Sequence, residues 1–413
     1  MELSYCTNVH PAEDLEGVLD QLSRYAGPAR RAAGLERLGV GLWLPAPLAR
    51  RLAGDADARA QLKAALEAEG LEVRTVNAFP HTAFHAEVVK LDVYRPDWTD
   101  PRRADYTLDC AEVLAELLPD GAVGSLSTLP LGWRFPWTAT EDDAATAALA
   151  RVSSGLRGLR ERTGRTVRLA IEPEPGCVLD TVDDVIDWLT PRLGTASAFD
   201  DARALPGARP GDRGEQGDPG RIDPEFVGIC LDTCHLAASF ADPVETVRRV
   251  RRAGLRIPKI QASAALHVDD PSDPAARSAL AEFAEPRYLH QTRALAADGA
   301  VLRMDDLPEA LDRLRTDGPW RVHFHVPLHL APAAPLTSTT EVLRRAVAEV
   351  RELFPGDETH LDVETYTWSV LPGGAGDLAA GIAAELRWAV AELDPDPATA
   401  TATATAPAER IAS

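Results

Sequence analysis

The sequence predicts an α/β fold, a (β/α)8 TIM barrel, on three observations. Short β-rich runs recur along the chain, and long segments rich in Ala, Leu, Arg and Glu with helical periodicity separate them. Strict alternation of strand and helix favours parallel strands with helical crossovers, and about eight such units favour a closed barrel. The runner-up, a doubly wound open sheet, usually has a glycine-rich first turn, whereas the first turn here reads TNVHPAED.

The expected strands are short and rich in β-forming residues. They are Leu3–Val9, Gly39–Leu44, Val73–Phe79, Ala122–Thr128, Thr166–Glu172, Val227–Asp232, Pro258–Ala262, Arg321–Val326 and Leu361–Thr367. Because these are nine candidates for eight places in a barrel, we expect one of the last three to lie outside it or in an insertion. The segment 264–318 is long enough to hold an insertion late in the barrel, with a hairpin around Tyr288–Met304.

The expected helices lie between the strands. They are Asp14–Arg31, Pro47–Ala68, Tyr106–Leu118, Asp142–Thr163, Val182–Leu189, Pro243–Arg252, Leu307–Thr316 and Thr339–Leu353. We expect one barrel domain over residues 1–393. Two stretches predict disorder: residues 194–223, which are rich in Gly, Pro and charge, and the tail 394–413 with its alternating Ala and Thr.

Composition excludes several classes of function. The formal net charge of −21 repels polyanions, which argues against nucleic acid or an anionic membrane surface as a partner. Five cysteines without a CxxC pair argue against a disulfide framework. The N-terminal MELSYCTNVH does not resemble a signal peptide, and no run reaches the roughly 18 apolar residues of a spanning helix. We therefore expect a cytoplasmic protein without direct membrane insertion.

Carboxylates occupy the ends of three expected strands. The fifth strand ends in IEPEPG, where Glu172 and Glu174 share a face by two-residue alternation. The sixth ends in ICLDTCH, with Asp232 at the strand end, and the last reads HLDVETYTW, with Asp362 and Glu364 on one face. A helix cap or an arginine partner would account for any one of them. Independent caps need not fall on matching strand ends, so their agreement favours one shared site.

Histidines accompany these carboxylates. His235 follows Asp232, and the expected strand VHFHVPLH carries His323 and His325 on one face, although a single strand histidine is more often structural. Carboxylate oxygens and neutral imidazoles that converge at strand ends form the donor set of a divalent metal site. Such a metal would polarise a substrate carbonyl or hydroxyl, and a further carboxylate would move the proton.

Cysteine chemistry is disfavoured. Cys230 shares a face with Asp232 and Cys177 follows the turn after Glu172, but the spacing matches no zinc pattern, so buried small hydrophobes are the favoured interpretation. A nucleophilic cysteine working with His235 would need an oxyanion hole, for which the sequence has no signature.

Polar and aromatic side chains after several strands are candidates to bind a polar, anionic or aromatic small molecule. Those we select are Asn77, His85, Lys90, Arg95, Trp133, Arg134, Lys259, Gln261 and Arg287. The loop 89–107, with its interleaved cations and aromatics, has an equally good alternative interpretation as a surface loop whose arginines pair with nearby aspartates.

The pattern of strand-end residues resembles a known superfamily. Glu172, Asp232 with His235, a later histidine and Glu364 resemble the xylose-isomerase-like barrels of sugar isomerases and epimerases. More closely, the sequence resembles the EboE-type metabolite traffic proteins. The similar segments, which span nearly the whole chain up to Pro372, are YCTNVHP, NAFPHTAFH, VYRPDW, GSLSTLPLGW, IEPEPGC, CLDTCHLA, KIQASAAL, EPRYLHQ, FHVPL and VETYTWSVLP.

The superfamily resemblance implies one divalent metal ion, Mn, Mg, Co or Zn, with His235 touching the substrate. The implied ligands are Glu172, Asp232, His325 and Glu364. The third ligand stays open among Gln261, His323 and His325; we favour His325, because its distance to Glu364 along the chain resembles one strand–helix unit.

Glu174 and His85 are the candidates to carry a proton. The sequence differs from the epimerase pattern at Val178, where the glutamate that usually transfers the proton would stand. This difference puts epimerase activity in doubt more than metal binding.

The closer resemblance implies a role in moving secondary-metabolite precursors, alongside a membrane prenyltransferase-like partner from the same operon. Two functions are therefore expected in competition. One is a metal-dependent isomerase or epimerase acting on a small polar metabolite, and the other is a non-catalytic metabolite-binding or scaffold protein. A third, a phosphodiesterase on the same fold, is disfavoured because the charge of −21 opposes a nucleic acid substrate.

Overall fold

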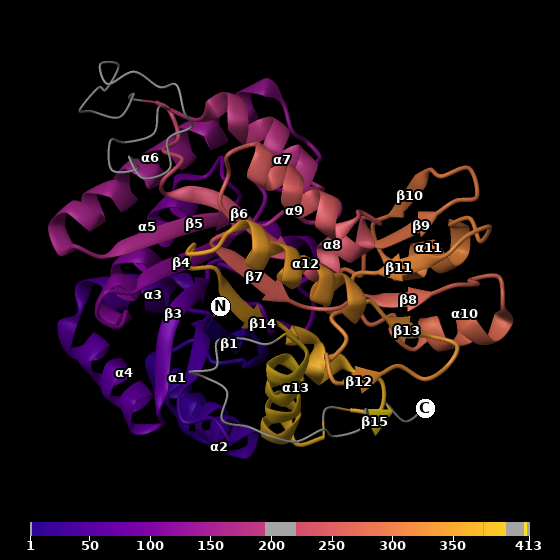
Figure 1. Cartoon of the computed structure of the whole chain (residues 1–413), viewed down its shortest axis with the longest axis horizontal. Coiled ribbons are helices and arrows are strands. Elements are labelled where there is room, and N and C mark those ends of the chain that lie inside the picture. Colours follow the sequence, from indigo (N-terminus) through magenta and orange to yellow (C-terminus); the bar gives the residue numbers. More distant parts are fainter. Residues whose placement is uncertain (1, 195–219, 375, 394–408, 411–413) are drawn as a thin grey trace.

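The computed structural model describes residues 2–194, 220–374, 376–393 and 409–410. Most of the two stretches predicted to be disordered, 194–223 and 394–413, lies outside these ranges. Eight parallel strands close into a barrel in the order β1–β14–β7–β6–β5–β4–β3–β2 (Figure 1). The predicted (β/α)8 barrel is thereby confirmed.

The barrel strands are short, and every neighbouring pair is parallel. They are β1 Glu2–Cys6, β2 Leu38–Leu42, β3 Leu71–Asn77, β4 Val123–Thr128, β5 Thr166–Ile171, β6 Val227–Asp232, β7 Lys259–Ala262 and β14 His360–Val363. In the register of the last three, Asp232 lies beside Gln261, and Gln261 lies beside Asp362. Residues that follow these strands therefore emerge at one level, at the carboxyl end of the barrel.

Helices follow the strands around the outside. They are α1 Leu15–Gln21, α2 Gly27–Ala33, α3 Ala46–Gly54, α4 Ala56–Ala68, α5 Pro101–Leu117, α6 Ala139–Thr163, α7 Val182–Leu189, α8 Thr233–Ala238, α9 Pro243–Arg252, α12 Thr340–Leu353 and α13 Leu378–Leu393. Short helical turns are η1 Thr7–Val9, η2 Leu22–Ala26 (a π-helix), η3 Lys90–Tyr94, η4 Thr190–Arg192 and η6 Tyr366–Val370.

Local sequence explains where the long helix α6 begins and ends. Thr138 and Glu141 form a reciprocal capping box at its start, which satisfies backbone N–H groups that have no partner within the helix. Gly164 ends it with φ of 72°, a left-handed conformation that glycine adopts without strain. The helices α8 and α13 have no counterpart among the predicted helices.

A second, five-stranded sheet is inserted between β7 and α12, on the right of Figure 1. Its order is β10–β9–β11–β8–β13, with β8 Leu266–Val268, β9 Thr292–Leu295, β10 Val301–Met304, β11 Trp320–Val322 and β13 Thr337–Ser338. The helices α10 Pro274–Ala281 and α11 Leu307–Arg313 belong to the same stretch, and a two-stranded pair joins β12 Leu330–Ala331 to β15 Glu409–Arg410.

The structure corrects the extent of the expected strand Arg321–Val326, which lies in this insertion. Only its first residues form a strand, β11, which pairs antiparallel with β8 and β9 and lies outside the barrel. His323 and His325 therefore do not share a face of a barrel strand; they lie in an irregular segment after β11. Backbone hydrogen bonds from His323 to Gln291 and from Val326 to Ala264 hold that segment in place.

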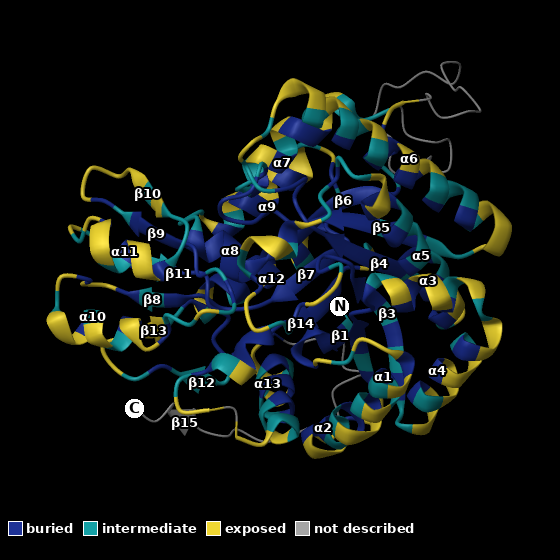
Figure 2. Ribbon diagram, turned by 180° about the vertical axis from the view of Figure 1, so that it is seen from behind, coloured by how far each residue is buried: buried dark blue, intermediate teal, exposed yellow. Residues whose placement is uncertain are grey.

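The barrel interior is buried and partly polar. Figure 2 shows the barrel strands in the buried colour, and all six residues of β6 are buried. Below the carboxyl end, Lys259 Nζ lies 2.9 Å from Asp362 Oδ2, and neither side chain has exposed surface. A Cβ atom on Gly41 would collide with the Asp362 carboxylate, so only glycine fits beside this ion pair. No helix in the described part of the chain is long and apolar enough to cross a membrane.

Candidate metal centre and substrate pocket

Three carboxylates meet at the carboxyl end of the barrel. Glu172 follows β5, Asp232 ends β6 and Glu364 follows β14; one oxygen of each lies within 4.8 Å of the others, and all three residues are buried. Burial and the charge of Asp232 raise the pKa of Glu172 to about 7. Burial and the neighbouring carboxylates likewise raise the pKa of Glu364 well above its usual value. The raised pKa values reflect the burial and mutual repulsion of these carboxylates, which a cation bound among them would relieve.

Asp232 both caps a helix and belongs to the carboxylate cluster. Its Oδ1 accepts hydrogen bonds from the His235 backbone N–H (2.9 Å), which caps α8, and from the Ser263 hydroxyl (2.8 Å). Its Oδ2 is buried without a hydrogen-bond partner. Burial opposes its ionisation, but His235, His325 and these hydrogen bonds together lower the pKa of Asp232. The two interpretations of this residue, helix cap and metal ligand, are therefore compatible.

His325 presents a lone pair to the same cluster. Its Nδ1 lies 2.6 Å from the backbone carbonyl oxygen of Glu364, which only accepts, so Nδ1 carries the hydrogen. Its Nε2 lies 3.8 Å from Asp232 Oδ2 and has no hydrogen-bond partner. Burial lowers the pKa of His325 to about 4, which keeps the ring neutral. A neutral imidazole whose tautomer is set by a carbonyl is the usual form of a metal-ligating histidine.

The donor atoms fit a divalent metal ion. Glu172 Oε2, Asp232 Oδ2 and His325 Nε2 are all buried, all lack a hydrogen-bond partner and all are electron-pair donors. Leaving such atoms unsatisfied costs about 1–3 kcal/mol each, and a bound cation would remove that cost. The fourth donor, Glu364, is held by the amides of Asn8 (2.8 Å) and Asn77 (2.7 Å) on its Oε1. Carboxylate oxygens with one imidazole suit Mn, Mg, Co or Zn.

A histidine pair adjoins this cluster. His235 Nε2 lies 3.0 Å from His323 Nε2, while the Nδ1 atoms face the Pro173 carbonyl oxygen (2.9 Å) and the Gln291 side-chain oxygen (2.7 Å). The Gln291 amide nitrogen donates to the Pro175 carbonyl, which fixes the orientation of that side chain. Since both Nδ1 atoms donate, one proton is shared between the two Nε2 atoms.

The shared proton is held on His235. Burial disfavours its charge, but the carboxylates of Asp232, Glu174 and Glu172 outweigh burial and raise the pKa of His235. Burial and the neighbouring histidines lower the pKa of His323 well below its usual value. These opposite shifts favour His235 over His323 as the ring that carries the proton between the two Nε2 atoms.

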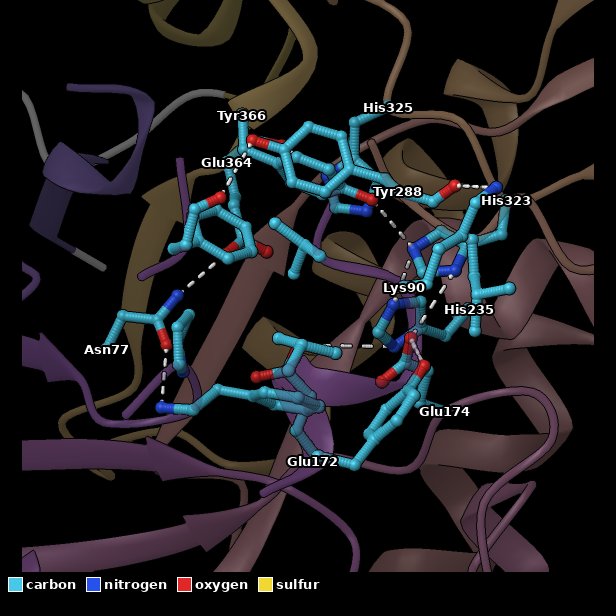
Figure 3. A pocket seen from close by; sticks show the side chains of 17 residues that line it. Asn77, Lys90, Glu172, Glu174, His235, Tyr288, His323, His325, Glu364 and Tyr366 are labelled. Atoms are coloured by element: carbon cyan, nitrogen blue, oxygen red, sulfur yellow. Dashed lines mark hydrogen bonds and ion pairs between the residues drawn. The ribbon is translucent and has the colours of Figure 1, made fainter. Parts of the chain in front are cut away.

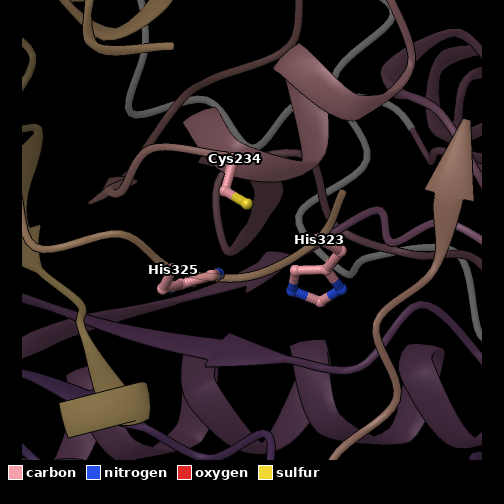
Figure 4. A group of neighbouring side chains, drawn as sticks. All are labelled: Cys234, His323 and His325. Carbon is pink, nitrogen blue, oxygen red and sulfur yellow. The ribbon is translucent and has the colours of Figure 1, made fainter. Parts of the chain in front are cut away.

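Three further groups have potential ligand atoms, and one of them is Asp232, His235 and His325. Glu174, His235 and His323 place one atom each within 4.8 Å of one another, as do Cys234, His323 and His325 (Figure 4). Burial raises the pKa of the Cys234 thiol well above its usual value, so it is not a thiolate. Burial also raises the pKa of Glu174, whose Oε1 accepts from the Tyr94 hydroxyl at 2.8 Å.

A pocket of about 500 Å³, counting its open mouth, adjoins these groups, and Asp232 and Cys234 are not among the residues that line it (Figure 3). Its polar end is formed by Asn77, Glu172, Glu174, His235, His323, His325 and Glu364. The opposite side is apolar and is formed by the segment between β3 and α5, by Tyr288 and Leu289 of the insertion, and by Tyr366. The structure thus brings together the four sequence-predicted ligands, His235 and Glu174, as well as Asn77 and Lys90.

The remaining predicted binding residues lie elsewhere. Lys259 pairs with Asp362 below the cluster, and Gln261 is fully buried beside it in the barrel. His85 does not line the pocket; its Nε2 lies 2.7 Å from the Asn8 carbonyl oxygen, and its ring packs against Trp43.

The three predicted arginines and Trp133 also lie outside the pocket. Arg95 lines a separate groove on the outer side of the segment after β3. Trp133 packs against Tyr94, with ring centroids 5.2 Å apart, and Arg134 pairs with Asp305. Arg287 donates to the Ser369 hydroxyl. Arg134 and Arg287 are therefore bound to other protein groups, and in the loop 89–107 Arg102 pairs with Asp100, as the surface-loop interpretation expects.

Sequence reasoning missed several residues that hold the cluster. Asn8 and Ser263 bind the carboxylates of Glu364 and Asp232, and Tyr366 lines the pocket. Asn8 and Ser263 stand just after β1 and β7. A position just after a barrel strand, the signal that identified the carboxylates, also identifies the small polar side chains of Asn8 and Ser263.

Comparisons with solved structures show only distant likenesses. An L-ribulose 3-epimerase is 12% identical, with a TM-score of 0.46 over 95% of this chain and 95% of that chain. The IolI protein with a bound zinc atom is 13% identical, with a TM-score of 0.47 over 97% of this chain and 100% of that chain. A sugar phosphate isomerase/epimerase from Parabacteroides distasonis is 11% identical, with a TM-score of 0.42 over 94% of each chain. No protein-family model and no curated protein matches the sequence.

Proposed function

We propose that the chain is a metal-dependent isomerase or epimerase acting on a small metabolite that carries a hydroxyl next to a carbonyl. The supporting observation is the set of three buried donor atoms without partners, on Glu172, Asp232 and His325, beside the carboxylate of Glu364. A divalent metal bound there would polarise adjacent carbonyl and hydroxyl oxygens of the substrate.

The residues beside the cluster suit the proton transfer that such a reaction needs. Isomerisation and epimerisation both remove a proton from the carbon next to the carbonyl and return one. Glu174 lines the pocket, and its raised pKa makes it a better acceptor and donor near neutral pH than an exposed glutamate. The Tyr94 hydroxyl and the Gln291 amide hold its Oε1, so its orientation is fixed. His235 holds a second proton at the same wall.

A non-catalytic role is the second candidate. Position 178, where an epimerase of the resembled superfamily would carry its proton-transfer glutamate, is a partly buried valine whose backbone N–H donates to the Gly132 carbonyl. Without that glutamate, the same pocket would hold a precursor without converting it. In this alternative the chain is a metabolite traffic protein of the EboE type, in the cytoplasm and associated with a membrane prenyltransferase-like partner.

Metal content and proton exchange separate these candidates. Purified protein loaded with Mn is expected to retain about one ion per chain, and the double variant Asp232→Ala, Glu364→Ala is expected to retain none. NMR in D2O then follows a series of hydroxyketones. Metal-dependent incorporation of deuterium next to the carbonyl supports the enzyme, and tight binding without incorporation supports the carrier. A protein that binds no divalent metal, with stability unchanged by chelation, would contradict the proposal.

A further inference from the structure

The pocket has two sides of opposite character, and their chemistry limits the ligand. One side carries the buried carboxylates and histidines described above. The other is formed by Phe79, Phe84, Tyr94, Tyr288 and Tyr366, which we call the aromatic wall. Figure 3 shows Tyr288 and Tyr366 opposite Glu172 and Glu174, on the side where Glu364 and His325 also lie, and the ring centroids of Tyr366 and His325 are 4.7 Å apart. A ligand that fills the pocket therefore contacts both sides at once.

The pocket has no cation free to bind a phosphate. Among the described lining residues, Lys90 is the only lysine or arginine. Its Nζ already faces Asp306 Oδ2 at 2.6 Å and the carbonyl oxygens of Tyr288 at 2.7 Å and Glu285 at 3.5 Å. An ammonium group has three donors, and these three acceptors occupy them. Phosphate recognition relies on free arginine, lysine or backbone N–H donors, and a phosphate here would face Glu172, Glu174 and Glu364 instead.

The aromatic wall offers ring surface rather than hydroxyl groups. The Tyr94 hydroxyl donates to Glu174, and the Tyr288 hydroxyl donates to the Phe84 carbonyl oxygen at 3.3 Å. Tyr366 packs edge-on against Tyr288 and Phe84, with ring centroids 4.9 Å and 5.5 Å away. The Tyr366 hydroxyl lies 3.5 Å from His323 Nε2, on the polar side, and the rings of the wall are suited to a ring or another apolar group of the ligand.

The insertion positions this wall. The backbone N–H groups of Val89 and Lys90 both donate to the Arg287 carbonyl oxygen, at 2.8 Å and 2.9 Å. These bonds join the segment that carries Phe84 to the one that carries Tyr288, although the two are about 200 residues apart in the sequence. The insertion between β7 and α12 therefore completes the apolar half of the pocket.

We propose that the ligand is an uncharged, unphosphorylated molecule with adjacent carbonyl and hydroxyl oxygens at one end and an aromatic or similar apolar group at the other. This inference rests on the proposed function, because the metal centre would take the oxygen-bearing end. The proposed ligand differs from a sugar phosphate at its second end, where the pocket has the aromatic wall in place of the cations that bind a phosphate.

Three hydroxyketones with one head group test the proposal. 2-Hydroxy-1-phenylethanone, dihydroxyacetone and dihydroxyacetone phosphate share a carbonyl next to a hydroxymethyl group and differ in the substituent on the other side. Isothermal titration measures their binding to protein whose Mn content has been determined. The phenyl compound is expected to bind at least about tenfold more tightly than dihydroxyacetone, since burying a ring of this size contributes about 1.5–3 kcal/mol. The phosphate is expected to bind no more tightly than dihydroxyacetone.

Two variants localise the effect. Phe84→Ala is expected to remove most of the advantage of the phenyl compound while leaving the Mn content and dihydroxyacetone binding unchanged. Leu91→Ala, at an exposed position outside the pocket, is the matched control and is expected to change neither ligand. The inference is overturned if dihydroxyacetone phosphate binds most tightly or if the phenyl compound and dihydroxyacetone bind equally. It is also overturned if none of the three binds to Mn-loaded protein. The Mn content reports separately on the metal centre, so failure of the proposed function is distinguishable.

Discussion

Two groups of buried charges lie one above the other in the barrel, and they differ in how their charges are balanced. In the lower group, Lys259 faces Asp362, whose Oδ1 also accepts from the Ser4 hydroxyl at 2.7 Å. In the upper group, Glu172, Asp232 and Glu364 face one another, and atoms of the first two have no partner. Burial is similar in both. The lower pair is balanced by a cation of the chain itself, whereas the upper group is only partly compensated by His235 and Lys259 and is compatible with a bound divalent cation.

The largest expected effect of a single change concerns the lower pair. Lys259→Met leaves Asp362 buried without its cation and is expected to cost about 3–5 kcal/mol of unfolding free energy, measured by urea denaturation. Glu364→Gln in the upper group is the contrasting change. It keeps an oxygen for Asn8 and Asn77 and removes a repelling charge, so the metal-free protein is expected to be at least as stable as wild type. Equal destabilisation by both changes would remove the distinction between the two groups.

Metal removal is the second way to test that distinction. Free Mn at about a thousand times its dissociation constant is expected to stabilise the folded protein by about 4 kcal/mol. Chelation should therefore lower the midpoint of thermal unfolding by several degrees. The midpoint of thermal unfolding of the Asp232→Ala variant should be the same with and without chelator. The same midpoint for wild type with and without chelator would show that no divalent cation binds at the upper group.

A pH dependence of similar size is expected for the metal-free protein. Because burial and the charge of Asp232 raise the pKa of Glu172 from 4.5 to about 7, the folded state binds a proton here that the unfolded state releases. Its contribution to stability is therefore present below about pH 4.5 and is lost as the pH rises to about 7, a difference of about 3 kcal/mol. The stability of wild type relative to Glu172→Gln, from denaturation at each pH, should fall over this range.

The matched control for that measurement is an exposed glutamate. Glu67 lies on the solvent side of α4, and the difference between wild type and Glu67→Gln is expected to stay constant with pH. Saturating Mn should remove the fall of this difference with rising pH, because a bound cation favours the ionised carboxylate of Glu172. If the stability difference between wild type and Glu172→Gln did not change with pH, it would contradict the proposed repulsion among the carboxylates of the upper group.

The smallest expected effect concerns a residue that orients a ligand. Ser263→Ala removes one of two hydrogen bonds to Asp232 Oδ1, together with the bond that Ser263 accepts from the Cys234 backbone N–H, and is expected to weaken Mn binding about tenfold. Ser272→Ala, at an exposed turn, should leave Mn affinity unchanged. Titration calorimetry measures both, and equal affinity of Ser263→Ala and wild type would show that the cluster does not depend on this bond.

Much of the fold was predictable because it depends on local pattern. Alternation of strand and helix predicts the barrel, and eight of the nine expected strands lie in it. The ninth, Arg321–Val326, lies in the insertion, as expected of one of the last three candidates, but the sequence did not identify which one because such a run is equally compatible with a strand of either sheet. The helix α13 was missed, although its Glu385 accepts from the Leu328 backbone, Thr365 and Trp368 beside the end of β14.

The sequence by itself determined that Glu172, Asp232 and Glu364 share one site, because carboxyl ends of parallel barrel strands must meet at one level. Only the tertiary structure placed His325 Nε2 beside Asp232, since His325 reaches the cluster from an irregular segment held by contacts between distant residues. It also decided that Lys259 compensates Asp362 instead of binding substrate, and that aromatic rings cover the pocket. Side-chain partners of this kind depend on non-local packing, which a strand or helix pattern does not encode.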